Sequence, residues 1–247
     1  MSFKVDFRVV EEIVASIRGF ISSHGAELFY KNCLKAVSCL FDHLADVRWE
    51  REALRCSLWF SYGGLSILER HLVNTSLYSL ILAREIGLDK RDVILTALSA
   101  ALHDVGKIYT PFHSLPRSLT LIEKMLIMRH PEYGFDMVIQ HSEEVGLGVL
   151  YHHECEDGSG YPYGCCGREL HISAKIIHVC DVYEALTSRR PYRVPMSPED
   201  ALEFMSSSRE KRKFDREILK EFTGLLRSKA SHFNAGIQRH PRIPIRE

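Results

Sequence analysis

The stretch of the chain best suited to chemistry is residues 152–162, with the sequence HHECEDGSGYP. Adjacent imidazoles and nearby carboxylates can bind metal ions, and the glycines and proline let the backbone turn sharply around a ligand. Neighbouring residues on a helix point about 100° apart, so His152 and His153 could bind two ions, or one ion and the substrate. Glu154 is expected to fix an imidazole tautomer or pair with an arginine, and Asp157 to shape the turn through Asx-type hydrogen bonds.

A second pair of possible ligands follows an apolar run. His103 and Asp104 come directly after Ile94–Leu102 and before Val-Gly-Lys. An imidazole can bind one ion while the adjacent carboxylate bridges two, and Gly106 would let a substrate or backbone approach closely. Lys107 shares a face with His103 if the helix continues that far. Taken alone, the pair is more typical of a capped helix end with a hydrogen-bonded histidine and a solvated lysine.

Three isolated residues extend this set. His71 lies on an apolar helical segment, and His130 precedes a proline at a predicted helix start. A single histidine in either setting is more often an ordinary core or surface side chain. Asp181 follows the apolar run Ile176–Cys180, where a carboxylate is costly to bury unless it is paired or bound to a metal. Its position favours a ligand role.

Candidate substrate contacts lie near these ligands. Arg190 and Arg193 follow the helical segment that carries Asp181, and arginine forms bidentate hydrogen bonds with phosphate. A solvated basic helix end explains the same two residues equally well. Tyr161 is either an anchor of its loop or a surface on which a substrate ring stacks.

Together these segments resemble the HD-GYP family of cyclic di-GMP phosphodiesterases, in order and in sequence, from about Ile67 to Phe222. The resemblance implies an all-helical HD-superfamily enzyme that uses iron, manganese or similar ions. It implies a metal site made of His71, His103, Asp104, His130, His152, His153 and Asp181. It also implies catalytic roles for His103, Asp104 and Lys107, and substrate contacts from Lys107, Tyr161, Arg190 and Arg193.

Three positions depart from the family pattern. Ile67 stands where some members have a glutamate that holds a third metal ion. We therefore expect two divalent ions, Fe or Mn in the first place, with Zn or another transition metal as the alternative. His153 could then be free of metal, and pGpG is the expected main product. Residues 115–118 shorten a Lys-Pro-Gly segment of the family, which predicts a different substrate rim, and Glu184 replaces a common aspartate.

The elements that must position these residues are predicted to be helices throughout, so the fold class is all-α. Apolar residues recur at helical spacing, and no alternating run is long enough for a substantial sheet. The predicted helices are Phe7–Ile21, Ala26–Leu44, Trp49–Phe60, Ile67–Ile86, Arg91–Leu102, Leu121–Arg129, Pro131–His141, Ile172–Ser188, Pro198–Met205 and Arg216–Leu226. Two glycines near residue 63 predict a boundary between an N-terminal helical region (1–62) and the catalytic domain (63–228). A basic tail (229–247) is expected to follow. The first region could be a dimerisation or sensory module, or a helical cap on the catalytic domain.

Composition limits the possible partners. Lys plus Arg and Asp plus Glu both total 32, so no global charge attracts a nucleic-acid polymer or a membrane surface. No apolar run approaches the length of a membrane span, and seven scattered cysteines suit a reduced cytoplasmic protein better than a disulfide framework. They also lack the paired spacing of a structural zinc site. A diguanylate cyclase or another signalling protein is a candidate partner, and a homodimer is a candidate assembly.

The leading prediction is a cyclic di-GMP phosphodiesterase of bacterial second-messenger signalling, making pGpG and then GMP if a second bond is cut. One alternative keeps the metal chemistry but changes the substrate, for example to cyclic GMP-AMP. Another is a catalytically poor module that binds cyclic di-GMP and signals to a partner. The intact set of ligand-type residues favours catalysis.

Overall fold

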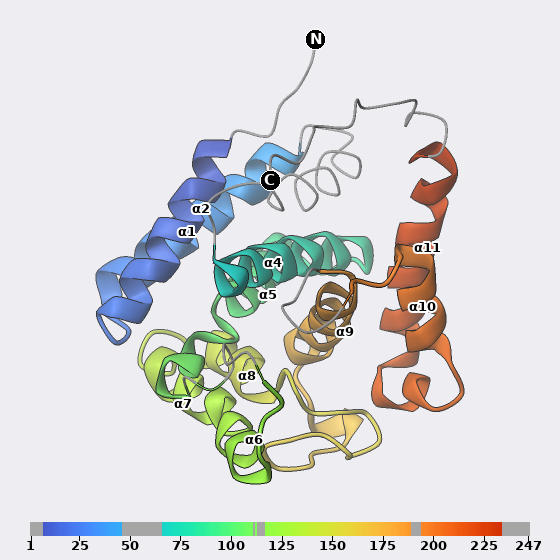
Figure 1. Ribbon diagram of the computed structural model, residues 1–247. Helices are drawn as coiled ribbons and strands as arrows, with labels where there is room; N and C mark the ends of the chain where they lie inside the picture. Colours follow the sequence, from blue (N-terminus) through green and yellow to red (C-terminus); the bar gives the residue numbers. More distant parts are fainter. Residues whose placement is uncertain (1–6, 46–65, 111, 113–116, 189–193, 234–247) are drawn as a thin grey trace, which may run out of the picture.

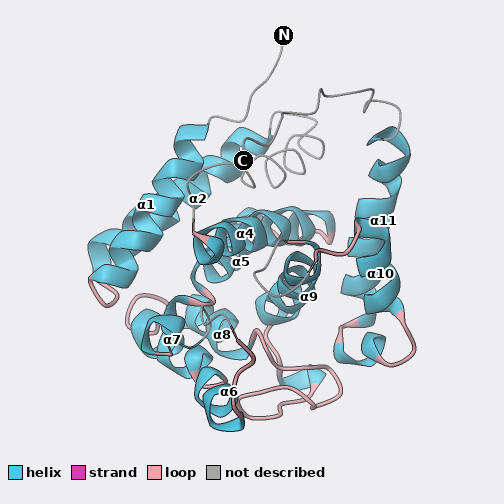
Figure 2. Ribbon diagram, in the orientation of Figure 1, coloured by secondary structure: helices cyan, strands magenta, loops and turns pink. Residues whose placement is uncertain are grey.

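The protein is all-α, as the sequence predicts (Figure 2). A computed structural model describes residues 7–45, 66–110, 112, 117–188 and 194–233, and no strand occurs within these ranges. The helices are α1 (Phe7–Ser22), α2 (Glu27–Ala45), α4 (Ile67–Glu85), α5 (Lys90–Leu102), α6 (Leu121–Ile127), α7 (His130–Val138), α8 (Glu143–Tyr151), α9 (Ile172–Thr187), α10 (Pro198–Ser206) and α11 (Arg216–Phe233). Short 3₁₀ helices cover Val105–Tyr109, Gly167–Glu169 and Glu210–Lys213.

Helices α4 and α5 form the centre of the molecule (Figure 1). The α1–α2 hairpin packs on one side of them, α7 and α8 lie below, and α9 connects this centre to α10 and α11. Buried apolar side chains from each of these elements belong to one continuous core cluster, which includes Ile17 of α1, Leu98 of α5 and Phe222 of α11. The N-terminal hairpin therefore shares the core of the helices that carry the candidate ligands.

Local sequence explains where several helices begin. Ser66 caps α4, and Glu69 completes a capping box by returning its carboxylate to the Ser66 backbone N–H. Ser197 caps α10 and is followed by Pro198 in the first turn, as predicted. Pro131 likewise lies in the first turn of α7.

Helix α8 is the element that the sequence pattern did not predict. Gly146 and Gly148 interrupt its apolar periodicity, and glycine disfavours a helix interior. The structure explains both residues by close packing. A Cβ atom at Gly148 would lie 2.7 Å from Ser99 of α5, and one at Gly146 would lie 3.2 Å from Phe135 of α7. The glycines let α8 approach these helices, and Ser142 supplies its N-cap.

Some expectations fall outside the described residues. The structure does not describe the predicted helix Trp49–Phe60, the boundary near residue 63 or the first half of the shortened segment 115–118. The domain division therefore stays a prediction. At the other end, α11 continues to Phe233, into the segment predicted to be a tail. No helix among the described residues is long and apolar enough to cross a membrane.

Candidate metal centre

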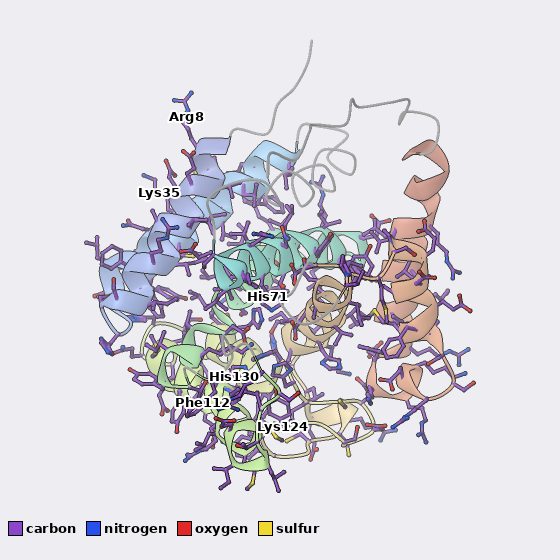
Figure 3. The ribbon with its side chains drawn as sticks, viewed as in Figure 1. Arg8, Lys35, His71, Phe112, Lys124 and His130 are labelled. Carbon is purple, nitrogen blue, oxygen red and sulfur yellow. The ribbon has the colours of Figure 1, made fainter. Side chains whose placement is uncertain are left out.

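Several helix ends and two helix interiors bring the candidate ligands together. His71 lies inside α4 and Asp181 inside α9, while the other ligands lie at the ends of α5 and α8 and at the start of α7. Figure 3 shows His71 and His130 directed into the interior, whereas Arg8 and Lys35 project outward from the hairpin. All the predicted metal-site residues, namely His71, His103, Asp104, His130, His152, His153 and Asp181, lie in the described part of the chain and converge there.

The turn after α5 is shaped to place Asp104 at the middle of this group. Helix α5 ends at Leu102, His103 is its C-cap, and a 3₁₀ helix starts at Val105. Gly106 lets this turn contact α7, because a Cβ atom there would lie 2.1 Å from the His130 carbonyl oxygen. The α-helix therefore does not continue to Lys107, and the Lys107 ammonium instead contacts the Asp104 carboxylate.

The first group of possible ligand atoms surrounds one oxygen of Asp104. His71 Nε2 and His103 Nε2 lie 3.5 and 3.6 Å from Asp104 Oδ2. Asp181 Oδ1 lies 3.1 Å from His71 Nε2. The second group surrounds the other oxygen, with His130 Nε2 at 2.9 Å and His152 Nε2 at 3.8 Å from Asp104 Oδ1. His153 belongs to the second group, and its Nδ1 lies 3.7 Å from Asp181 Oδ2.

Hydrogen bonding fixes where the lone pairs of these imidazoles point. His103, His130 and His152 each direct Nδ1 to the carbonyl oxygen three residues earlier, at 2.7, 2.7 and 2.6 Å, so Nδ1 carries the donated proton. In a neutral ring Nε2 then carries a lone pair. Yet His130 and His152 bring their Nε2 atoms to 3.2 Å. Facing lone pairs repel unless a cation lies among them, so these residues fit bound metal ions.

Burial and charge determine the protonation of this cluster. Burial lowers the pKa of His103 and holds those of His152 and His153 well below the usual value, which keeps these rings neutral. Burial opposes ionisation of Asp104, but the charge of the Lys107 ammonium outweighs it and holds the pKa of Asp104 well below its ordinary value. Neutral imidazoles around ionised carboxylates are the forms that bind metal.

Glu154 has a different role from either one predicted. Among the described residues its carboxylate contacts neither an imidazole nor an arginine. Oε1 accepts backbone N–H bonds from Tyr163 and Gly164 at 2.7 and 3.1 Å, and Oε2 accepts one from Cys165 at 3.1 Å. Glu154 is 1% exposed. The carboxylate thus anchors the loop after the histidine pair, because three backbone N–H groups of that loop donate hydrogen bonds to it.

The same loop places Tyr161 beside the cluster. The Tyr161 ring lies 4.6 Å from the His153 ring at an interplanar angle of 30°, and the Tyr161 backbone N–H donates to the His153 carbonyl at 3.1 Å. Gly160 permits this approach, since a Cβ atom there would lie 2.5 Å from the His153 carbonyl oxygen. Asp157 accepts a bond from the Ser159 N–H at 3.1 Å, which is the predicted Asx-type contact.

Other residues singled out in the sequence lie elsewhere. Arg190 and Arg193 fall outside the described residues, so their contact with phosphate stays a prediction. Glu69, a carboxylate in the first turn of α4, forms a bidentate pair with Arg18 of α1. Within the described residues, the groups able to hold a metal ion contain only histidine and aspartate.

Sequence reasoning assigned no role to His178. This histidine is buried, and its Nδ1 donates to the His152 carbonyl at 3.0 Å. The centre of its ring lies 5.0 Å from that of Phe214 at an interplanar angle of 36°. It therefore connects α9 to the end of α8, next to a candidate ligand. The signal that could have revealed it is a lone polar residue within the apolar run Ile176–Cys180.

Comparison with known proteins defines the class. The chain matches the HD domain family over residues 32–218 and belongs to that family. It is 37% identical over 135 residues to the cyclic di-GMP phosphodiesterase response regulator RpfG of Xanthomonas campestris, covering 52% of this chain and 36% of that protein. It is also 37% identical over 144 residues to a cyclic di-GMP phosphodiesterase of Thermotoga maritima, covering 56% and 39%.

A third relative has a different substrate in its name. The 3'3'-cGAMP-specific phosphodiesterase 1 of Vibrio cholerae is 33% identical over 165 residues, covering 65% of this chain and 37% of that protein. The chain thus spans well under half the length of the curated relatives it matches. Among solved structures, the HD-GYP-type protein Bd1817 of Bdellovibrio bacteriovorus superposes with a TM-score of 0.72 at 16% identity, covering 89% of this chain and 70% of that one. These matches confirm the resemblance to HD-GYP proteins and the helical fold.

Proposed function

We propose that this protein is a metal-dependent phosphodiesterase that hydrolyses cyclic di-GMP. The observation that carries the proposal is the convergence of the histidine and aspartate side chains on both oxygens of Asp104, in two groups able to hold one ion each. The names of the relatives from Xanthomonas campestris and Thermotoga maritima support the substrate and the reaction. We propose two ions, Fe or Mn, because mixed imidazole and carboxylate ligands suit these metals.

Different residues of the chain would bind the metal ions, contact the phosphate and contact the base in such a reaction. Bound divalent ions supply Lewis acidity, which offsets the negative charge of the phosphodiester and activates water. Asp104 would bridge the two positions, and the neutral imidazoles would complete them. The Lys107 side chain is 16% exposed beside Asp104, which suits an additional contact with a phosphate oxygen. Tyr161 offers an aromatic ring beside His153 on which a substrate base could stack.

We propose pGpG as the main product. Ile67, at the position of the third-metal glutamate in some family members, is apolar and 47% exposed at the first turn of α4. Glu69, the nearest carboxylate on that turn, is occupied by Arg18. A chain without a third ion would lack one site for a second phosphodiester cleavage.

A second candidate substrate is 3'3'-cyclic GMP-AMP. The observation that favours it is the similarity to Vibrio cholerae phosphodiesterases specific for that compound, at 33% and 32% identity for two of them. Both substrates present the same phosphodiester linkage to the metal centre and differ in one base. Tyr161 and the rim beyond it would therefore decide between them.

The test is hydrolysis by protein purified anaerobically and loaded with Fe²⁺ or Mn²⁺. Cyclic di-GMP and 3'3'-cyclic GMP-AMP are each supplied alone and then together, and the products are separated by chromatography. We expect cyclic di-GMP to give pGpG with the higher kcat/KM. Preference for the mixed dinucleotide would support the second candidate. Tight binding of cyclic di-GMP without turnover would contradict the enzyme assignment in favour of a receptor.

A further inference from the structure

The imidazoles of the metal centre differ in what lies behind them. Three of the rings are held by neutral backbone carbonyl groups through Nδ1, on the side away from the centre. The pairs are His103 with Ala100, His130 with Ile127, and His152 with Val149. In each case the acceptor lies three residues earlier on the same stretch of helix or turn, so the arrangement is local.

His71 is the exception among these rings. Its Nδ1 lies 2.5 Å from Glu184 Oε2, a carboxylate of α9 that is 1% exposed. Asn74 donates to the other carboxylate oxygen at 3.3 Å, and the Ser188 hydroxyl also contacts it. A buried glutamate held by two further polar groups is therefore directed at the rear of a single candidate ligand.

This contact changes the charge around only one of the two groups. The group of His71 and His103 has Asp104, the nearer oxygen of Asp181 and Glu184 behind it. The group of His130, His152 and His153 shares Asp104 and has the farther oxygen of Asp181 3.7 Å from His153 Nδ1, with no carboxylate among the described residues hydrogen-bonded behind these rings. A carboxylate hydrogen-bonded to a metal-binding imidazole makes that imidazole more basic and fixes its orientation.

The two groups also differ in access to solvent. The His153 side chain is 20% exposed, whereas those of His71 and His103 are 6% and 0% exposed. An ion in the group that contains His153 therefore has a shorter path to bulk water and to a substrate.

We propose that the two metal positions are unequal, with Glu184 making the position of His71 and His103 the tightly held one and leaving the position of His130, His152 and His153 exchangeable. The inference rests on the metal centre of the proposed function and deepens it. Glu184 is a positioning residue in this scheme, since it acts through the His71 ring.

The test is anaerobic titration of the metal-free full chain with Mn²⁺ in competition with a chelator, read as two stepwise Kd values. The wild-type protein is expected to show two steps at least about tenfold apart. Glu184→Gln, which keeps the shape but removes the charge, is expected to weaken the tight step roughly 10- to 100-fold and leave the weak step in place. Glu144→Gln is the matched control, because Glu144 is exposed and pairs with Arg91 away from the centre.

Single-position variants assign the steps. The ion retained by His130→Ala occupies the tight position and is expected to dissociate more slowly than the ion retained by His71→Ala. Adding Glu184→Gln should weaken binding in the first background and leave it unchanged in the second. These variants also keep the inference testable if Glu184→Gln alone does not fold.

Two equal Kd values for the wild type, or equal weakening of both steps by Glu184→Gln, would overturn the inference while leaving the proposed hydrolysis intact. Failure of the wild type to bind any Mn²⁺ would overturn the metal centre itself. Binding in two unequal steps without hydrolysis of cyclic di-GMP would support the inference and contradict the proposed activity.

Discussion

The α1–α2 hairpin and the α4–α9 pair differ in the kind of side chain that they bury. Helix α1 buries an almost purely apolar stripe that includes Ile13, Ile17 and Phe20. Helix α4 buries leucines too, but also His71, and α9 buries Asp181 and Glu184. Apolar packing alone accounts for the side chains that the hairpin buries. The central pair retains charged groups in the interior, where they are costly unless paired or bound to metal.

This contrast separates stability from chemistry. Substitutions in the hairpin should change the free energy of unfolding while leaving the metal centre of folded molecules intact. Substitutions in the central cluster should remove metal and turnover. The hairpin is still connected to the site, because the His141 side chain in the turn after α7 donates to the Gly25 carbonyl at 2.7 Å.

The largest effect is expected for Asp104→Ala. Removing the carboxylate that faces both groups should abolish tight binding of both ions and lower kcat/KM by about a thousandfold or more, since metal ions contribute several kcal/mol to such reactions. Metal content by mass spectrometry and product formation by chromatography measure the two effects. Full metal content in this variant would show that Asp104 is not required to bind either ion.

Phe20→Ala should act on stability alone. Phe20 is fully buried and packs near Tyr30 and His141, so its truncation is expected to lower the free energy of unfolding by about 3–5 kcal/mol. Chemical denaturation measures this loss. If turnover per folded molecule also fell at a temperature where the variant is folded, the separation between hairpin and site would be wrong.

Glu154→Gln tests the loop after His152 and His153, and its expected effect is smaller than those of the two preceding variants. Glutamine places an amide group against backbone N–H donors, so we expect about 2 kcal/mol lower stability and a roughly tenfold higher KM as Tyr161 loses its position. Steady-state kinetics and thermal unfolding separate the two. Glu156→Gln is the matched control, since Glu156 lies in the same loop but pairs with the Lys175 ammonium at 2.8 Å. An equal rise in KM for both variants would contradict a specific role for Glu154.

The smallest effect is expected for Arg18→Ala. The hydrogen bond from the Arg18 guanidinium lowers the pKa of Glu69 from 4.5 to about 2. The stabilisation is therefore complete above about pH 4.5 and is lost as the pH falls towards 2. Because the pair is solvent-accessible, the variant should melt only a few degrees lower at neutral pH, with no difference near pH 2. A constant difference across this range would show that the ion pair is not its cause.

Helix positions and ligand types were predictable where the sequence repeats a local rule. The apolar spacing of α1, α4, α5 and α9 follows directly from burial of one helix face. The order of the histidine and aspartate segments was sufficient to predict that they belong together. Helix α8 was not predictable in this way, because its glycines serve contacts with Ser99 and Phe135, which are distant in sequence.

The roles of buried polar partners depend on tertiary structure. Glu154 bonds to backbone groups nine to eleven residues away, and Glu184 meets His71 across 113 positions of the chain. No spacing rule brings such atoms together. Composition could identify these carboxylates as unusual, but only the packing of α4 against α9 and the return of the loop after α8 show what each one contacts.

The most direct test of the account is anomalous diffraction from crystals of the full chain grown anaerobically with Mn²⁺. We predict two Mn²⁺ peaks on either side of the Asp104 carboxylate, one beside His71 and His103 and the other beside His130 and His152. A single peak, a third fully occupied peak, or peaks away from Asp104 would contradict the two-ion centre.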